Sequence, residues 1–291
     1  MAGLSGVLVV DKPAGWTSHD VVARLRGIAH TRRIGHAGTL DPMATGVLVV
    51  LIGRATRAAE FAEAQVKGYE ARIRFGLTTD TLDIEGRVLS ESGIRPGPEA
   101  LRAVLPRFTG RIEQIPPMYS AIKVGGRRLY EIARAGGEVE RKAREVYITK
   151  LDCAGPLPDG DYELSIECTK GTYIRSLCAD IGEALGCGAC MSALRRTYSG
   201  EYSLCGAVGL ETLAERGVEP FLRGVDSVFA SLPEIVLSGA RAERTARNGG
   251  ELRAEAEDGE YRVYSENGEF LLLGAVKNGV LRTVKSFFEV D

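Results

Sequence analysis

Several features that would assign a protein to a familiar class are missing from this sequence of 291 residues. It contains no P-loop, no G-x-G-x-x-G dinucleotide fingerprint and no H-E-x-x-H metal motif. Its longest apolar run, residues 47–52, is far shorter than the roughly 20 residues that a membrane-spanning helix needs. A secretory signal is also missing, because Asp11-Lys12-Pro13 interrupts the apolar residues 7–10. We therefore expect a cytoplasmic protein that does not associate with a membrane.

The six cysteines do not complete a recognisable metal site or disulfide framework. Cys187 and Cys190 have C-x-x-C spacing, but no second ligand pair at a matching spacing accompanies them. Cys168 and Cys178 fall on faces of their segments that otherwise look buried. We expect these residues to be reduced thiols that pack as small hydrophobic side chains.

The formal net charge of −2 argues weakly against a nucleic-acid-binding protein, but the charge is unevenly distributed. Residues 101–150 hold eleven Lys and Arg against five Asp and Glu, whereas residues 251–291 hold five against nine. Within the basic segment, residues 116–144 carry two Gly-Gly pairs and interleaved tyrosines without strong periodicity. This segment either binds the phosphate backbone of a nucleic acid or is a solvent-exposed face. Loops of this length are usually functional or disordered.

The hydrophobic patterns predict an α+β fold. Residues 69–75 and 161–168 alternate between apolar and polar side chains, as half-buried strands do. Residues 17–29 and 173–185 carry apolar residues at helical spacing. Because strands and helices are mixed rather than strictly alternating, we expect a mixed, largely antiparallel sheet flanked by helices.

The end of the chain predicts a separate, small β-rich domain. Residues 261–264, 270–273 and 281–284 are short apolar runs separated by Asn-Gly pairs, which are strong β-hairpin signals. We place the boundary near residues 231–233. The expected domains are therefore residues 1–230 and 231–291.

Asp41 is the strongest candidate for a catalytic residue. Residues 35–46 hold too many glycines for a helix, and Pro42 disfavours helical backbone at Asp41. A carboxylate presented from such a loop can act as a nucleophile or a general base. Alternatively, Asp41-Pro42 begins a short helix, with Asp41 as its N-cap. The GxxG of residues 35–38 also matches the RNA-clamping loop of KH modules, although a strand rather than a long helix is expected next.

Two further residues are candidates on different grounds. Thr172 is expected to cap the helix over residues 173–185, which places Arg175 in the first turn, where the helix dipole disfavours a cation. Arg175 therefore has either a buried carboxylate partner or a solvent-exposed side chain. Tyr69 begins the apolar face of its strand and either stacks on a base or belongs to the core.

These residues lie in blocks that resemble the motifs of TruB-type pseudouridine synthases. Residues 35–48, which contain Asp41, resemble the catalytic motif, and residues 6–13 resemble the opening strand and turn of the family. Lys67-Gly68-Tyr69 falls where the family has its active-site tyrosine. Further matching blocks are residues 114–121, 170–175, 185–189 and 194–196. The blocks cover residues 3–200 in the family's order, and the tail resembles a small PUA-like RNA-binding domain.

The resemblance implies a role for each candidate residue. Asp41 would be the essential aspartate, Arg175 its ion-pair partner, and Tyr69 would stack on the flipped base and take part in proton transfer. Leu194 would help to wall the uracil pocket, and His36 would support the RNA where the target base has left its stack. Further contacts to the RNA are expected from Lys12, Tyr173, Lys123, Arg127 and Arg128.

The function implied is the isomerisation of uridine to pseudouridine at position 55, in the T loop of tRNA, on the pseudouridine synthase fold. The N-glycosidic bond breaks, and uracil turns and rejoins the ribose through C5, once the base has left its stack. Since no redox change or group transfer is involved, we expect no cofactor and no metal. The basic residues 117–144 would fold over the T arm, and we expect a monomer that needs neither a guide RNA nor a protein partner.

Two other interpretations stay open. The catalytic subunits of RNA-guided pseudouridine synthases share the aspartate loop, although they usually carry longer terminal extensions than we expect here. Alternatively, the chain is a tRNA-binding or tRNA-remodelling protein without chemistry, for which Asp41→Asn would leave every function intact.

Overall fold

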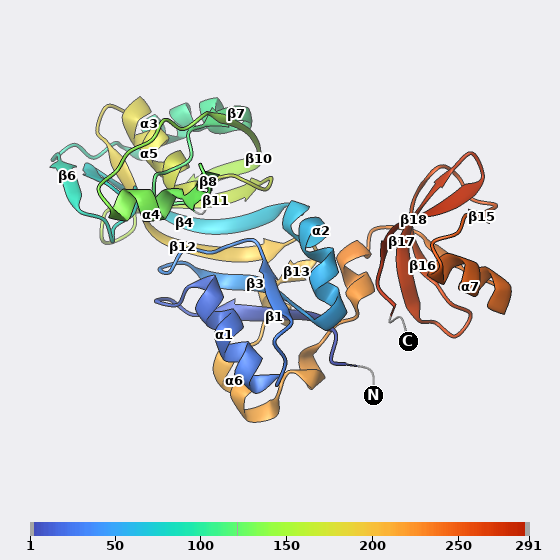
Figure 1. The fold of residues 1–291 in the computed structure, drawn as a ribbon. Helices are drawn as coiled ribbons and strands as arrows, with labels where there is room; N and C mark the ends of the chain where they lie inside the picture. Colours follow the sequence, from blue (N-terminus) through green and yellow to red (C-terminus); the bar gives the residue numbers. More distant parts are fainter. Residues whose placement is uncertain (1–2, 121, 289–291) are drawn as a thin grey trace.

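The computed structural model describes residues 3–120 and 122–288, except for the side chain of Lys123. A large sheet with helices at its sides forms most of the molecule, and the C-terminal segment forms a smaller β-rich body beside it (Figure 1). None of the described helices is long and apolar enough to cross a membrane.

The central sheet is mixed and largely antiparallel, as the sequence predicts. Its main path has the order β1-β3-β12-β4-β11-β10-β7, with β2 paired to β3 and β13 paired to β12. The strands are β1 Gly6–Lys12, β2 Ile34–Ala37, β3 Thr45–Ile52, β4 Lys67–Phe75, β7 Gly110–Gln114, β10 Arg144–Ala154, β11 Tyr162–Cys168, β12 Ala189–Ser199 and β13 Tyr202–Ser203. Only β3 and β12 pair in parallel among the described strands of this sheet. The α+β class is therefore confirmed.

The helices cover the sheet in two groups and bury separate parts of the core. Helix α5 packs against β12 and β4, over an apolar cluster that includes Ile73 and Leu177. Helix α1 packs beside β2 and α6, over a second cluster from β1 and β3. The helices are α1 Ser18–Ile28, α2 Ala59–Ala64, α3 Pro98–Val104, α4 Leu129–Arg134, α5 Ile174–Ala184, α6 Leu210–Arg216 and α7 Ala240–Arg247.

The C-terminal body is a five-stranded sheet of the order β14-β16-β17-β18-β15. Its strands are β14 Glu234–Val236, β15 Leu252–Arg253, β16 Gly259–Tyr264, β17 Phe270–Lys277 and β18 Val280–Ser286. Asn278 and Gly279 join β17 to β18 with φ of +52° and +72°, the backbone of a tight hairpin turn. The β-rich C-terminal domain is thus confirmed, while its boundary near residue 231 stays a prediction.

Three local expectations differ from the structure. Residues 35–37 belong to strand β2 rather than to a loop, because they pair with β3. Thr172 does not cap α5: the N-cap is Tyr173, without a side-chain hydrogen bond. The basic excursion contains a small hairpin and α4, with strands β8 Lys123–Val124 and β9 Arg127–Arg128. A second small hairpin pairs β5 Leu77–Thr79 with β6 Val88–Glu91.

Candidate active site

The expected catalytic aspartate lies in an irregular loop between β2 and β3. Residues 38–44 form no helix, so the alternative interpretation of Asp41 as a helix N-cap is wrong. Gly38 and Gly46 have φ of +84° and +98°, a region that side chains other than glycine rarely adopt. A Cβ at Gly46 would stand 2.2 Å from the carbonyl oxygen of Arg196. Glycine is therefore required where the loop enters β3 beside β12.

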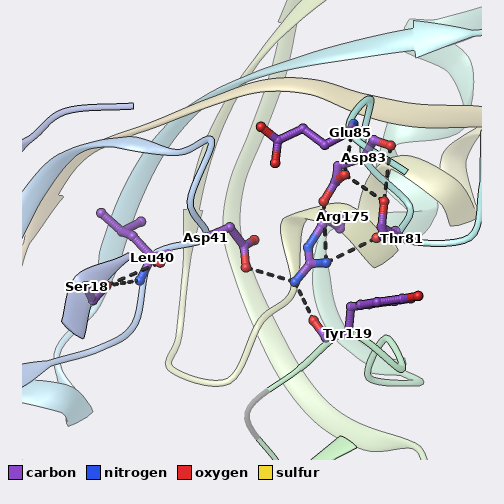
Figure 2. A network of polar contacts seen from close by, with 8 residues as sticks. All are labelled: Ser18, Leu40, Asp41, Thr81, Asp83, Glu85, Tyr119 and Arg175. Carbon is purple, nitrogen blue, oxygen red and sulfur yellow. Dashed lines mark hydrogen bonds and ion pairs between the residues drawn. The ribbon is translucent and has the colours of Figure 1, made fainter. Parts of the chain in front are cut away.

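Ser18, the first residue of α1, fixes the backbone immediately before Asp41. The N–H of Leu40 donates to Ser18 Oγ at 2.9 Å, and the hydroxyl donates to the Leu40 carbonyl at 3.2 Å (Figure 2). The Ser18 side chain is buried, so water does not compete for either bond. This contact anchors a loop that lacks regular secondary structure.

Lys12 supports the loop from the other side, and the expectation that it contacts RNA must be corrected. Its side chain is completely buried at the end of β1. The ammonium donates to the carbonyls of Pro13 at 2.9 Å, Trp16 at 2.6 Å and Pro42 at 3.1 Å. Because one of these carbonyls follows Asp41 directly, Lys12 holds the aspartate loop rather than a ligand.

Arg175 forms the ion pair with Asp41 that the sequence suggested. Its guanidinium donates to Asp41 Oδ1 at 2.9 Å and to the Tyr119 carbonyl at 2.8 Å (Figure 2). The other terminal nitrogen donates to the Thr81 carbonyl at 3.1 Å and lies 3.5 Å from Asp83 Oδ2. The arginine side chain is 6% exposed, so the alternative of a solvent-exposed Arg175 is wrong. Arg175 therefore bridges two carboxylates and locks the orientation of one of them.

A cavity of about 370 Å³ opens above this ion pair. It brings together the aspartate loop, the first turn of α5, residues 169–172 and the facing ends of β4 and β12. Five of the expected site residues line it, and four of them were expected at the reacting base: Asp41, Tyr69, Arg175 and Leu194. The fifth is Tyr173, which was expected to contact RNA. The cavity has polar and apolar walls and is large enough to hold a nucleobase.

The floor of the cavity is set by the register of two strands. Alternate residues of a strand point to the same face, which places Tyr69 beside Ala71 on β4 and Leu194 beside Arg196 on β12. Tyr69 pairs with Arg196, and Ala71 pairs with Leu194. Tyr69 and Leu194 are both 8% exposed, so each presents only a small part of its surface to the cavity. An aromatic and an aliphatic wall thus face the carboxylate.

Burial controls the protonation of the two central groups. It raises the pKa of the Asp41 carboxyl above its ordinary value, while the Arg175 guanidinium opposes that rise and the Asp83 carboxylate adds to it. Burial likewise raises the pKa of the Tyr69 hydroxyl, which the charge of Arg196 opposes. Burial therefore favours the neutral form of the Tyr69 hydroxyl, and Arg175 favours the ionised form of Asp41.

His36, Arg127 and Arg128 are not among the described residues that line the cavity. His36 lies on β2 opposite Val50, and its buried Nδ1 has no hydrogen-bond partner among the described residues. Arg127 and Arg128 are exposed on β9, and Arg128 donates to the Tyr130 hydroxyl at 2.9 Å. The side chain of Lys123 lies outside the part of the chain that the structure describes. The roles of these residues in RNA binding stay predictions.

Three charged residues of the site were missed by the sequence analysis. Asp83 is 6% exposed beside Arg175, whereas Lys67 and Arg196 line the cavity at 5% and 0% exposure. A signal existed for Lys67, which occupies a position of the β4 alternation that otherwise holds apolar residues. Arg196 lies on β12, where irregularities in the register interrupt the alternation. Asp83 lies in a turn, for which periodicity gives no information.

The comparisons with known proteins agree on one fold. A Cbf5-Nop10-Gar1 complex matches 97% of this chain and 85% of the matched chain, with a TM-score of 0.73 and 27% identity. An H/ACA RNP bound to a substrate RNA containing 2′-deoxyuridine matches 98% of this chain and 86% of its own, with a TM-score of 0.72 and 24% identity. The fold is that of the pseudouridine synthases.

Sequence comparison identifies the family. Residues 26–174 match the model of the TruB family pseudouridylate synthase N-terminal domain, and residues 175–224 match that of the tRNA pseudouridylate synthase B C-terminal domain. The tRNA pseudouridine synthase B of Azoarcus sp. is 42% identical over 96% of this chain and 93% of its own length. The enzyme of the same name from Pseudomonas aeruginosa is 46% identical over 81% of this chain and 79% of its own length. The one from Thermobifida fusca is 48% identical over 82% of this chain and 84% of its own length.

The chain belongs to the TruB family of pseudouridylate synthases. It is accordingly an isomerase that converts uridine to pseudouridine in tRNA, and the interpretation as a binding protein without chemistry is wrong. Among the described residues, no group of His, Cys, Asp and Glu side chains is arranged to hold a metal ion.

Proposed function

We propose that the enzyme isomerises the uridine at position 55, in the T loop of tRNA, after that base has flipped out of its stack into the cavity. The observation that carries this proposal is the Asp41–Arg175 ion pair at 2.9 Å, which lies in a cavity walled by Tyr69 and Leu194. A cavity of this kind is reached by an extruded base but not by a stacked one.

The proposed chemistry uses the carboxylate of Asp41 and the ring of Tyr69. The bond between C1′ of the ribose and N1 of uracil breaks, uracil turns, and a bond between C1′ and C5 forms. C5 then loses its proton and N1 gains one, so the product is an isomer of the substrate. Asp41 acts as the nucleophile or base, and the Tyr69 ring stacks on uracil while its hydroxyl takes part in proton transfer.

RNA binding is proposed to depend on basic and aromatic residues around the cavity mouth. Extruding a base costs a few kcal/mol, which phosphate contacts and stacking offset. The exposed Arg127 and Arg128, together with Arg144 at the cavity, are suited to phosphate contacts from residues 117–144. We assign the same binding function to a PUA-like domain over residues 231–291, which follows a catalytic domain over residues 1–230.

We also propose that the enzyme works in the cytoplasm as a monomer, without a cofactor, a guide RNA or a protein partner. The solved structures of similar fold contain RNA-guided complexes, so the two modes of action must be separated by experiment. The curated relatives, which are 42–48% identical, carry the name tRNA pseudouridine synthase B and support the guide-free mode.

The decisive experiment is to incubate the purified chain with unmodified tRNA, without additives, and to map pseudouridine along the RNA. We expect a single product at the T-loop uridine. Asp41→Asn should abolish the product while the dissociation constant for tRNA changes less than about threefold, because the substitution keeps shape and removes only the charge. Product that forms only when a guide RNA is added, or an active Asp41→Asn variant, would contradict the proposal.

A further inference from the structure

Two buried cationic side chains line the active-site cavity but are not among the residues of the proposed chemistry. Lys67 on β4 is 5% exposed and Arg196 on β12 is completely buried. Lys67 lies on the same strand face as Tyr69, two residues away, and Arg196 pairs with Tyr69 across the two strands. Both cations are therefore placed around the ring that is proposed to stack on uracil.

The two cationic side chains converge at Gly38 of the aspartate loop. A Cβ at Gly38 would lie 3.3 Å from Lys67 Cε and 3.4 Å from Arg196 Nη1. Arg196 donates to the carbonyls of Val47 at 2.6 Å and Gly38 at 3.1 Å. These contacts fix the guanidinium beneath the loop that carries Asp41.

Neither cation is neutralised within the described part of the chain. The Lys67 ammonium donates to the carbonyls of Glu63 at 2.7 Å and Gln65 at 2.8 Å, and the third N–H has no partner among the described residues. Neither Lys67 nor Arg196 has a carboxylate partner there, although Asp41 and Arg175 nearby are paired with each other. Two unpaired buried charges are costly, so an anion that enters the cavity is strongly favoured.

The environment of Lys67 reflects this cost. Burial lowers the pKa of its ammonium to about 8, and the charge of Arg196 acts in the same direction. Glu63 on α2 opposes the decrease, while Lys170 beyond β11 adds to it. The lysine therefore carries its positive charge at neutral pH and begins to lose it in mildly alkaline solution.

We propose that Lys67, together with Arg196, is a catalytic residue that stabilises the negative charge on uracil when the glycosidic bond breaks. The inference rests on the proposed function. When the C1′–N1 bond breaks, its electron pair stays on uracil and spreads over N1, O2 and O4. The pair is consumed when C5 bonds to C1′, the C5 proton leaves and N1 takes up a proton, so no oxidant or second substrate is needed.

The location of the two cations distinguishes this role from phosphate binding. The phosphates stay on the RNA backbone outside the cavity, where Lys170 and Arg144 are exposed at its rim. Lys67 and Arg196 lie instead at the floor, beside Tyr69. A fixed cation aimed at charge that develops during the reaction acts on the transition state more than on binding.

The test compares Lys67→Met, Lys67→Arg and the control Lys150→Met, whose side chain is exposed on β10 away from the cavity. Single-turnover formation of pseudouridine is measured with excess full-length enzyme, and tRNA binding is measured separately. Lys67→Met should slow the reaction by about 100-fold or more, with a tRNA dissociation constant within about threefold of wild type. Lys67→Arg should recover most of the rate, and Lys150→Met should match wild type.

The pH profile supplies a second readout that a purely structural lysine would not change. The wild-type rate should fall above about pH 8, and the Lys67→Arg rate should fall less over the same range. Lys12, whose pKa is also lowered to about 8 by burial, is present in both proteins. An equal alkaline decline in the two proteins therefore overturns the assignment to Lys67.

The remaining outcomes separate the inference from the proposed function. A Lys67→Met variant with a normal rate and weaker tRNA binding shows a phosphate contact and overturns the inference alone. A wild-type enzyme that forms no pseudouridine in tRNA refutes the proposed function, and the inference fails with it. If thermal unfolding shows that Lys67→Met does not fold, the comparison of wild type with Lys67→Arg across pH still decides the matter.

Discussion

Replacement of Arg175 by methionine tests the central feature of the site. The guanidinium contacts two carboxylates and two backbone carbonyls, and its side chain is only 6% exposed. Methionine fills much of the same volume but leaves Asp41 and Asp83 without their shared cation. Because the side chain of Asp83 is 8% exposed, its charge is not compensated by water after the substitution.

The expected loss of stability follows from this burial. Removing one partner of a buried ion pair costs about 3–5 kcal/mol. The Asp41 side chain is 31% exposed and partly solvated, so we expect a value near the lower limit, about 3 kcal/mol, in the free energy of unfolding by urea. Arg282→Met is the matched control, because Arg282 pairs with Glu251 at the same 2.9 Å while both side chains are about 60% exposed. Its cost should be at most about 1 kcal/mol.

Catalysis should change in a way that stability alone does not explain. Arg175 opposes the rise in the pKa of Asp41, so its removal should shift the acidic limb of the pH–rate profile to higher pH. Turnover at neutral pH should fall by about 100-fold or more, and tRNA affinity should change little. A variant with normal turnover, an unshifted pH profile and a weaker affinity for tRNA would refute the interpretation of the ion pair.

Two further predictions concern stability. Gly46→Ala should abolish activity and lower the free energy of unfolding by more than about 2 kcal/mol, because φ is +98° and the new Cβ would stand 2.2 Å from the Arg196 carbonyl oxygen. Gly15 has φ of +79° but open space around it, so Gly15→Ala should lower the free energy of unfolding by only about 1 kcal/mol. Equal costs for the two glycines would show that the contact with β12 does not matter. Burial and the neighbouring Glu183 raise the pKa of Asp180 to about 6, so the favourable contribution of its protonated form is present below pH 4 and is lost as the pH rises through 6. The free energy of unfolding of Asp180→Asn by urea should therefore equal that of wild type at pH 4 and exceed it by about 1–2 kcal/mol at pH 8. A variant that is more stable than wild type only at low pH would refute the reasoning.

The parts of the fold that depend on local pattern were predictable from the sequence. Alternation in β4 and β11 marked half-buried strands, and helical spacing over residues 17–29 marked α1, which begins with a reciprocal cap between Thr17 and Asp20. The Asn278-Gly279 pair forms the expected hairpin turn. In each case the information lies within a few consecutive residues, and tertiary packing reinforces the local preference rather than overriding it.

The contact between Asp41 and Arg175 was suggested for a different reason. A cation in the first turn of α5 conflicts with the helix dipole, and that local conflict indicated a carboxylate partner elsewhere. No such conflict marks Asp83, which occupies a turn where acidic residues are common. The pairing of β2 with β3 was missed because the glycines of residues 35–38 indicate a loop when they are considered without their partner strand.

Lys12 shows why a predicted RNA contact depends on tertiary structure. Its side chain was expected to contact RNA, whereas its ammonium is enclosed by three carbonyl oxygens. Whether a lysine reaches solvent depends on which strands and loops close over it. That depends on pairings such as β1 with β3, which a periodic pattern does not specify.

The aspartate loop owes its shape to side chains rather than to regular backbone pairing. Ser18 fixes residue 40, Lys12 fixes residue 42, and Arg196 fixes residues 38 and 47 on either side of them. These three polar side chains are almost completely buried, at 1%, 0% and 0% exposure, which is costly unless each hydrogen bond is made. An unpaired loop of ordinary composition would relax when a ligand entered the cavity. Here relaxation would break buried hydrogen bonds, so Asp41 is held in position before the substrate arrives, and binding energy need not be spent on ordering it.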